Sequence, residues 1–370
     1  MKRRDFLCAA AGAACSLVPK LAEAGADSLR HKAEARGLVY GCAVKSRNLR
    51  DDAQFRAAVA NEAGILVPEY ELKRQFIQPE PNRYDFAAVD FILQSAARDD
   101  QKARGHTLAW YDANPAWLPN ALNDSTTAAA KAKLLTEYIA FVTKRYAGRM
   151  HSWDVVNEAV EPDNGRSDGM RSQSIWYEAL GEDYIPLAFH AAKQADPHAL
   201  LFLNDFGVEA PIRWNDRRRK ALLNLLDRLK SKDVPVEAFG IQGHLHPYRD
   251  GFDAKVFARF IHDLEGYGIK LMITELDVSD RGGPDDPQKR DADVAAVTKD
   301  FLNVALESHQ TLGVLTWGLT DRYTWLSTSD KYKWPDGQLP RALPLDGILA
   351  RKPMWDAISN AFDLAANRMQ

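Results

Sequence analysis

The sequence predicts an α/β protein that folds as a single (β/α)8 barrel. Eight short apolar, β-rich segments recur along the chain and alternate with amphipathic helical stretches, which is typical of a parallel sheet covered by helices. Eight strands are the number that closes such a barrel, and 370 residues fall within the length range of this fold. Polar side chains gather where the segments end, and a parallel barrel brings those ends together on one rim.

The expected strands are short and evenly distributed. They cover residues 37–44, 63–71, 102–110, 151–158, 199–207, 238–245, 269–277 and 312–321. The stretches between them, such as residues 132–147 and 219–231, carry apolar side chains at the three- and four-residue spacing of amphipathic helices. No linker rich in Pro, Ser or Gly interrupts the pattern, so we expect one domain over residues 25–370, with long loops at 281–287 and 334–344.

The first residues are typical of an export signal. Lys2, Arg3 and Arg4 precede a short apolar run that ends in an A-x-A sequence at positions 22–24. Paired arginines followed by "DFL" are typical of the twin-arginine type of signal. We therefore expect residues 1–24 to be removed and the mature protein to be periplasmic or secreted. No later segment is apolar and long enough to span a bilayer, so we expect no membrane association after signal removal.

Composition excludes several classes of partner. A formal net charge of -3 gives no basis for nucleic-acid binding, and we expect none. Of the three cysteines only Cys42 lies beyond the signal, so no intramolecular disulfide is expected, and its apolar surroundings predict a buried side chain. Nine tryptophans and twelve tyrosines offer flat faces that suit ring-shaped ligands such as sugars. We expect a monomer that needs no cofactor.

Polar or aromatic side chains end seven of the eight expected strands. They are Glu69 and Glu71, His106 and Trp110, Asn157 and Glu158, Asn204 and Asp205, Gln242 and His244, Glu275 and Asp277, and Trp317. One such residue could be a buried group with a local partner, but each one left unpaired would cost on the order of a few kcal/mol. The repetition therefore predicts an active site at the mouth of the barrel.

Two glutamates stand among these strand ends. Glu158 closes the fourth strand in "WDVVNEAV", and Glu275 closes the seventh in "ITELDV". Either one alone could be a helix-capping charge. Two carboxyl groups on one rim, beside tryptophans and without an evident set of metal ligands, are instead typical of glycoside hydrolysis. One must stay protonated to donate to the leaving oxygen, while the other must be ionised to attack the anomeric carbon.

The neighbouring side chains suggest which carboxyl group does which. A histidine of the adjacent sixth strand beside Glu275 would keep that carboxylate charged, and Asp277 would orient the imidazole. This favours Glu275 as the nucleophile. Asn157, directly before Glu158, could bind the sugar 2-hydroxyl, a contact that strengthens in the transition state. This favours Glu158 as the acid and then the base.

The motifs "WDVVNEAV", "ITELDV", "RGHTLAW" and "WGLTDRYTW" together resemble those of the endo-1,4-β-xylanases of glycoside hydrolase family 10, over about residues 36–365. The resemblance implies a retaining double displacement on the β-1,4-xylosidic bonds of xylan or xylo-oligosaccharides. It implies that Glu275 forms the covalent glycosyl-enzyme and that Glu158 is the acid/base. It also implies a supporting Asp277 and a set of substrate-binding residues: Glu69, Lys73, His106, Trp110, Asn157, Gln242, His244, Trp317 and Trp325.

The sequence departs from the family pattern on one side of the cleavage point. Family members usually read close to "TPENEMKW" at the second strand, whereas this chain reads "VPEYELKR", so Tyr70 replaces an Asn that binds a distal sugar. After the third strand "WHSQ" becomes "WYDA", so Tyr111 replaces a His and Ala113 replaces a Gln that contacts the same sugar. The resemblance therefore implies an intact catalytic layer with weaker binding at an altered subsite formed by Tyr70 and Ala113.

The residues leave three alternatives. A retaining hydrolase of the same fold could act on another β-glycan or an aryl β-glycoside, because the departures lie where specificity is set. A non-catalytic sugar-binding barrel is a second alternative, although both carboxylates and their supports are present. A metal-dependent hydrolase would use His244-Leu245-His246, but this pair is a weak signal without an evident third ligand, so we expect no metal site.

Overall fold

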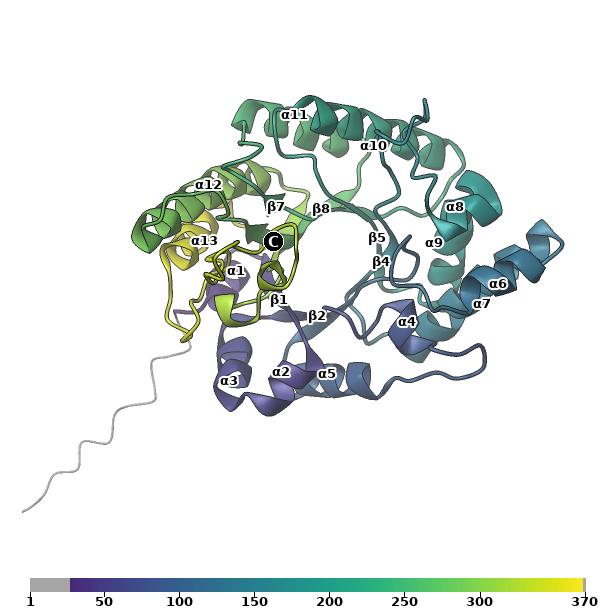
Figure 1. The fold of residues 1–370 in the computed structure, drawn as a ribbon, viewed down its shortest axis with the longest axis horizontal. Coiled ribbons are helices and arrows are strands. Elements are labelled where there is room, and N and C mark those ends of the chain that lie inside the picture. Colours follow the sequence, from purple (N-terminus) through teal and green to yellow (C-terminus); the bar gives the residue numbers. More distant parts are fainter. Residues whose placement is uncertain (1–26, 369–370) are drawn as a thin grey trace, which may run out of the picture.

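The computed structural model describes residues 27–368, and it shows a parallel β-barrel ringed by helices (Figure 1). The strands are β1 (Val39–Val44), β2 (Ile65–Pro68), β3 (Lys102–Gly105), β4 (Ser152–Asn157), β5 (Leu200–Asp205), β6 (Ala238–Ile241), β7 (His244–Leu245), β8 (Lys270–Val278) and β9 (Thr311–Thr316). Strands β1 to β6 pair in order, and the ring is closed by the β6–β8, β8–β9 and β9–β1 pairings. All pairings are parallel. The short β7 continues the path of β6 and pairs with the end of β8, so β6 and β7 together count as one strand of an eight-stranded barrel. The predicted fold is confirmed.

Helices cover the outside of the barrel, and at least one helix connects each of the eight barrel strands to the next (Figure 1). The α-helices are α1 (Leu29–Glu34), α2 (Ser46–Asp51), α3 (Ala53–Glu62), α4 (Arg74–Ile77), α5 (Ala87–Arg98), α6 (Leu118–Asp124), α7 (Ala128–Arg145), α8 (Ile175–Leu180), α9 (Tyr184–Ala195), α10 (Arg213–Ser231), α11 (Ala254–Glu265), α12 (Pro287–Glu307) and α13 (Pro353–Leu364). The described residues also form short 3-10 helices, η1 (Gly181–Asp183), η2 (Asp321–Tyr323) and η3 (Trp325–Ser327).

Local sequence explains where the long helices begin. The side chain of Thr127 caps α7 by accepting a hydrogen bond from the backbone N–H of Ala130. Asp253 caps α11 in the same way, and Asp286 caps α12, which then starts with a proline that needs no N–H partner. The apolar stripes predicted within residues 132–147 and 219–231 belong to α7 and α10, whose buried faces pack against the barrel.

The barrel is filled from the inside as well as covered from the outside. An inner cluster is contributed by alternating positions of the strands and contains Ala43, Ile65, Val67, Phe202, Ala238, Met272, Leu315 and Trp317. Gly240 of β6 faces this interior, and a Cβ atom at that position would lie only 2.1 Å from Oδ1 of Asn204. The absence of a side chain at Gly240 therefore makes room for the polar side chain at the end of β5.

A buried carboxylate ties the first and last helices of the barrel together. Glu62, at the end of α3, accepts hydrogen bonds from the backbone N–H of Leu29 at 2.9 Å and from Nε1 of Trp355 at 3.0 Å. It also pairs with Arg351 at 2.9 Å. These contacts join α1, α3 and the start of α13, so the closed ring of strands is matched by a closed ring of helices.

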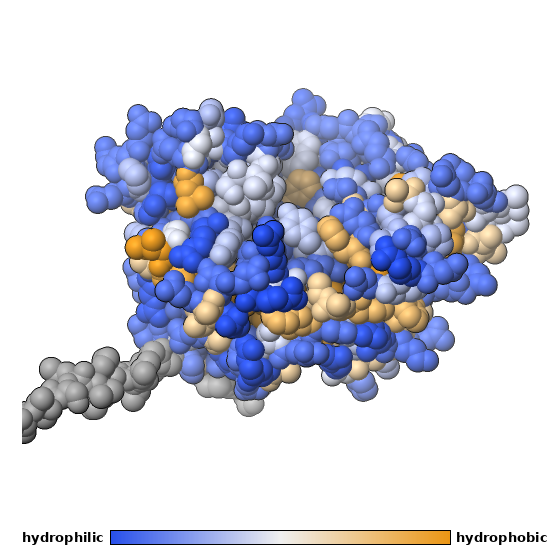
Figure 2. Space-filling view, turned by 60° about the horizontal axis from the view of Figure 1, so that its bottom comes forward, coloured by the Kyte–Doolittle hydropathy of each residue, from blue (hydrophilic) through white to orange (hydrophobic). Residues whose placement is uncertain are grey.

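The face of the molecule seen in Figure 2 is hydrophilic over most of its area, and Cys42 is buried in β1 as predicted. Within residues 27–368, no helix combines the length and apolarity that crossing a membrane requires.

The predicted export signal, residues 1–24, lies outside the described residues. The loop before α12 ends at Asp286, one residue earlier than predicted, because Pro287 already belongs to the helix.

Candidate active site

The strand ends open into a cavity of about 690 Å³, a volume typical of small-ligand sites. Most of the residues predicted for the site line this cavity: Tyr70, Lys73, His106, Trp110, Ala113, Asn157, Glu158, Gln242, His244, Glu275, Trp317 and Trp325. Asp277 and Glu69 do not line it and are buried behind it. The closed parallel barrel thus brings together side chains that are as far apart in sequence as Tyr70 and Trp325.

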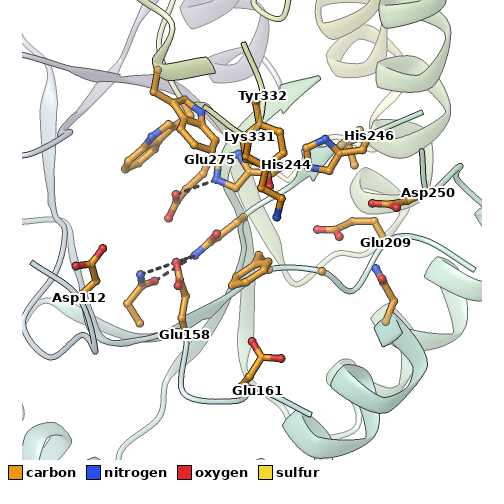
Figure 3. A pocket seen from close by; sticks show the side chains of 18 of the residues that line it. Asp112, Glu158, Glu161, Glu209, His244, His246, Asp250, Glu275, Lys331 and Tyr332 are labelled. Atoms are coloured by element: carbon orange, nitrogen blue, oxygen red, sulfur yellow. Dashed lines mark hydrogen bonds and ion pairs between the residues drawn. The ribbon is translucent and has the colours of Figure 1, made fainter. Parts of the chain in front are cut away.

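The two predicted catalytic carboxyl groups face each other across the cavity (Figure 3). Glu158 directly follows β4, and Glu275 lies within β8. Oε1 of Glu158 accepts hydrogen bonds from Nδ2 of Asn157 and from Nε2 of Gln242, each at 3.1 Å. Both donors point at the same oxygen, so the other oxygen of Glu158 is the one that can carry an acidic proton.

A buried amide connects the two carboxyl groups. Nδ2 of Asn204, at the end of β5, donates to Oδ1 of Asn157 and to Oε1 of Glu275, at 2.8 Å in each case. Its own Oδ1 accepts from the Thr274 hydroxyl at 2.7 Å. Asn204 was noted in the sequence as one of several polar strand ends, without a role in the site. The structure gives it one, because it positions Asn157 and Glu275 relative to each other.

Glu275 lies among groups that stabilise its anion. Nε2 of His244 lies 3.3 Å from Oε2 of Glu275, while Nδ1 lies 2.8 Å from Oδ1 of Asp277. Burial alone would lower the pKa of His244, but Asp277 and Glu275 raise it well above its usual value. The resulting imidazolium donates to both carboxylates. Burial alone would raise the pKa of Glu275, but His106, His244 and the Asn204 amide lower it below its ordinary value.

The surroundings of Glu158 act in the opposite direction. Burial raises the pKa of this carboxyl group most, and the nearby Asp205 and Glu275 raise it further, while the hydrogen bond from Gln242 and the charge of Arg171 lower it without reversing the shift. Asp205 is itself buried and accepts from Nε of Arg218 at 3.1 Å. These surroundings therefore favour the protonated form of Glu158 and the ionised form of Glu275. This is the division of roles that acid-assisted displacement at a glycosidic bond requires.

Asp154, the other carboxylate of the "WDVVNEAV" motif, serves a different purpose. It is buried, is paired with Arg104, and its Oδ2 lies 3.0 Å from Nδ1 of His106. His106 in turn lies 3.8 Å from Oε1 of Glu275 and packs edge-on against the ring of Trp317. Asp154 therefore fixes the orientation of an imidazole at the cavity wall.

At one end of the cavity a lysine is held between two aromatic rings. Nζ of Lys73 lies 4.6 Å from the ring centre of Tyr70 and 4.7 Å from that of Trp110. Ala113 lies beside them, in a turn with a φ angle of 52°. The carboxylate of Glu69 faces Nζ of Lys45 at 3.2 Å and not the cavity, and burial raises its pKa to about 7. Of the residues predicted to bind sugar, Glu69 is thus the one without direct access to the cavity.

The opposite end of the cavity contains Glu209, Lys331 and Tyr332, which the sequence did not predict, and His246, which it suggested only as half of a possible metal-binding pair. Glu209 is buried; its Oε2 accepts from the backbone N–H of Val208 at 2.8 Å, while its Oε1 has no partner among the described residues. The ring of His246 stacks on that of Tyr332 with centres 4.9 Å apart. Glu209, His246, Tyr332 and Lys331 all lie on this side of the cavity in Figure 3. They come from loops, where the alternation of strand residues gives no signal.

His244 and His246, which could have formed a metal-binding pair, point to different partners. His244 lies between two carboxylates, and His246 is stacked on Tyr332. Within residues 27–368 no group of three or more His, Cys, Asp or Glu side chains is arranged to hold a metal ion.

Fold and site together define a barrel glycosidase that works with two carboxyl groups. The chain belongs to glycosyl hydrolase family 10, which it matches over residues 28–361. It is similar to endo-1,4-beta-xylanase 2 of Claviceps purpurea, with 31% identity over 84% of this chain and 86% of the relative. Among solved structures it is similar to native xylanase 10B from Thermotoga maritima, with 30% identity, a TM-score of 0.80, and coverage of 91% and 98% of the two chains. A further similar structure is xylanase 10B from Thermotoga petrophila in complex with xylobiose, with 29% identity, a TM-score of 0.80, and coverage of 91% and 97%.

The effect of Asp205 on Glu158 can be measured through pH dependence. Asp205→Asn removes an anion that raises the pKa of Glu158 and leaves the cation of Arg218 in place. The pKa of Glu158 should therefore fall, and the alkaline limb of kcat/KM, where this acid loses its proton, should move to lower pH. Breaking the buried ion pair should also reduce stability by about 3 kcal/mol. The measurement is kcat/KM against pH on an aryl β-glycoside, with a thermal melt.

Asp163→Asn is the matched control, because Asp163 forms an ion pair with Arg217 at the surface. It should leave both limbs of the profile unchanged. An alkaline limb that stays in place or moves to higher pH in Asp205→Asn would show that Asp205 does not raise the pKa of Glu158.

Proposed function

We propose that this protein is a retaining endo-1,4-β-xylanase that cleaves xylan or xylo-oligosaccharides. The observation that carries the proposal is a pair of carboxyl groups at one cavity, the buried Glu275 and the half-buried Glu158, whose pKa values are shifted downward and upward respectively, in a family 10 barrel. The substrate follows from relatives that are named as β-1,4-xylanases and from the xylobiose bound to a similar structure.

Each of the two carboxyl groups acts twice in the proposed reaction. In the first step Glu275 attacks the anomeric carbon while Glu158 gives its proton to the glycosidic oxygen, so the leaving sugar departs as a neutral alcohol. In the second step Glu158, now ionised, takes a proton from water. The water oxygen bonds to the anomeric carbon and releases Glu275, so the anomeric configuration is retained.

One observation favours an altered specificity as a second candidate. Tyr70 and Ala113 stand where family members carry amide side chains, and in this protein Tyr70 packs against Lys73 instead. A cavity end built in this way could favour another β-glycan or an aryl β-glycoside over xylan. The two candidates share the chemistry and differ in the sugar chain that the Tyr70 end of the cavity accepts.

We also propose that residues 1–24 direct export by the twin-arginine route and that the mature protein is a periplasmic or secreted monomer. The basic start, the short apolar run and the A-x-A sequence support the first part. The exported protein should then begin at Gly25, which N-terminal sequencing would reveal, and light scattering should give the mass of a single chain. Recovery of exported protein that still begins at Met1 would contradict the signal.

The function is tested by release of reducing ends from xylan, cellulose, mixed-linkage glucan and aryl glycosides. We expect xylan and xylo-oligosaccharides to be cleaved fastest. Glu275→Ala and Glu158→Ala should each reduce kcat on xylan by several orders of magnitude, because one lacks the nucleophile and the other the acid. Added azide should give an α-glycosyl azide with Glu275→Ala and a β-glycosyl azide with Glu158→Ala, since only the latter keeps the covalent intermediate.

Glu80→Ala is the control, because Glu80 is exposed and pairs with Arg83 at the surface, away from the cavity. It should retain full activity. Faster cleavage of a glucan than of xylan would support the second candidate, and wild-type protein that binds xylan without cleaving any of these substrates would contradict both.

The Tyr70 end of the cavity generates a separate prediction. If Tyr70 weakens a distal sugar site, Tyr70→Asn should restore an amide contact worth about 1 kcal/mol and raise kcat/KM on xylohexaose roughly fivefold. It should leave kcat/KM on an aryl β-xyloside, which carries a single sugar, unchanged. Tyr70→Phe separates loss of the hydroxyl from loss of the ring. Product patterns and rates on xylohexaose that are identical for wild type and Tyr70→Asn would rule out this role.

A further inference from the structure

The backbone of Glu158 adopts a conformation that non-glycine residues seldom adopt. Its φ angle is 56°, in the left-handed region, where the Cβ atom crowds the chain. This turn lies immediately after β4 and directs the carboxyl group into the cavity towards Glu275 (Figure 3), where it accepts a hydrogen bond from Gln242. Such a conformation persists only when surrounding contacts hold it. The contacts on both sides of this residue therefore decide whether the proton donor is aimed correctly.

The peptide groups on either side of Glu158 are held by different parts of the molecule. Its backbone N–H donates to the carbonyl of Asn204 at 2.8 Å, which continues the β4–β5 ladder. Its carbonyl oxygen accepts from Nε of Arg171 at 2.9 Å. The strand thus fixes one side, and a side chain thirteen positions further along fixes the other.

Arg171 is built into the loop that follows Glu158. Its own backbone N–H donates to the carbonyl of Ala159 at 2.9 Å, and its Nη2 donates to the carbonyl of Val160 at 3.2 Å. The same nitrogen lies 3.3 Å from the carboxylate of Glu161. The residue is only 6% exposed. One planar guanidinium group therefore binds the carbonyls of residues 158 and 160 together, a fork that a lysine ammonium cannot reproduce.

The guanidinium group of Arg171 also supports the cavity wall. It lies 4.1 Å from the ring centre of Tyr111, and Tyr111 lines the cavity. Burial and the charge of Glu158 raise the pKa of Tyr111 to about 12, so its hydroxyl stays protonated. Arg171 itself does not line the cavity. Any effect of Arg171 on the substrate is therefore indirect and passes through Glu158 and Tyr111.

We propose that Arg171 is a positioning residue for the proton donor: its guanidinium fork holds the carbonyl of Glu158 so that the left-handed turn keeps the carboxyl group aimed at the leaving oxygen. The inference rests on the proposed function, because it concerns the acid step of that reaction. Removing the fork lets the turn relax and takes the carboxyl group away from Asn157 and Gln242. Glu275 is held by other residues and keeps its attacking position.

The experiment uses aryl β-xylobiosides whose leaving groups differ in basicity. A dinitrophenolate leaves without a proton, whereas a phenolate needs the acid. For Arg171→Met we expect kcat/KM on the phenyl substrate to fall about a hundredfold, the low end of what general acid catalysis contributes, and on the dinitrophenyl substrate by less than about fivefold. Arg171→Lys keeps the charge without the fork, so it should show the same selective loss at smaller size. A residue that only stabilises the fold would reduce both rates alike.

The pH profile gives a second readout. The charge of Arg171 lowers the pKa of Glu158, so its removal in Arg171→Met should move the alkaline limb to higher pH, opposite to the shift expected for Asp205→Asn. Arg166→Met is the matched control, because Arg166 lies in the same loop and pairs with Asp168 at the surface. It should leave rates and profile unchanged.

The outcomes separate the inference from the function. If wild type cleaves both substrates and the Arg171 variants lose equal factors on both, or lose nothing, the positioning role is wrong while the proposed function stands. If wild type cleaves neither, both fall. Should Arg171→Met not fold by circular dichroism, Arg171→Lys decides with the same pair of substrates, since a selective loss on the phenyl substrate supports the proposal and an equal loss overturns it.

Discussion

The side-chain amide of Asn204 sets the relative position of the two carboxyl groups, and much of the site depends on it. Its nitrogen donates to Asn157 and to Glu275, and its oxygen accepts from Thr274. Only one orientation of the amide satisfies two acceptors on one side and a hydroxyl donor on the other. The group therefore links β4, β5 and β8 with a fixed polarity. It fits inside the barrel because Gly240 leaves the space empty.

Around this link the site separates two electrostatic environments over a short distance. Glu275 is surrounded by donors, whereas Glu158 is half-buried with a second carboxylate, Asp205, nearby. Each shift of one pKa unit corresponds to about 1.4 kcal/mol, so modest differences in surroundings suffice to keep one group ionised and the other protonated. The negative charges of the two neighbouring aspartates are compensated, because Asp205 is paired with Arg218 and Asp277 with His244. The barrel can thus bury several ionised groups near one rim without leaving any of these unpaired.

The sequence was sufficient to predict the parts that follow from strand periodicity. Eight apolar segments, seven of them with polar or aromatic ends, predicted the barrel and its functional rim. Side-chain alternation predicted that Glu275 and Asp277 lie on one face, beside a histidine of the neighbouring strand. The structure brings His244 between those two carboxylates. These predictions succeed because side chains alternate between the two faces of a strand, so positions 275 and 277 share a face whatever their distant contacts are.

The parts that could not be predicted lie where conformation is set by contacts between distant segments. Arg171 and Glu209 come from loops, and nothing in their local sequence indicates that one holds the carbonyl of Glu158 and that the other lines the cavity. The direction of the Glu69 side chain could not be predicted from the sequence either. Strand alternation places it at the rim, but the direction of its side chain depends on Lys45, which follows β1 and pairs with it at 3.2 Å.

The arrangement at Tyr70 explains how this end of the cavity can differ from the family pattern while the catalytic layer stays intact. Lys73 has no carboxylate within ion-pair distance among the described residues, and burial lowers its pKa, an effect that Glu275 and Glu69 oppose. Its ammonium group lies between the rings of Tyr70 and Trp110, and two aromatic faces supply part of the stabilisation that burial removes. One of these two rings belongs to Tyr70, the residue that replaces the Asn of the family pattern. The replacement therefore removes an amide that would contact the sugar and adds a ring that contacts Lys73. The change alters no hydrogen bond of the catalytic carboxyl groups, since neither Glu158 nor Glu275 is hydrogen-bonded to Tyr70 or Lys73 within residues 27–368.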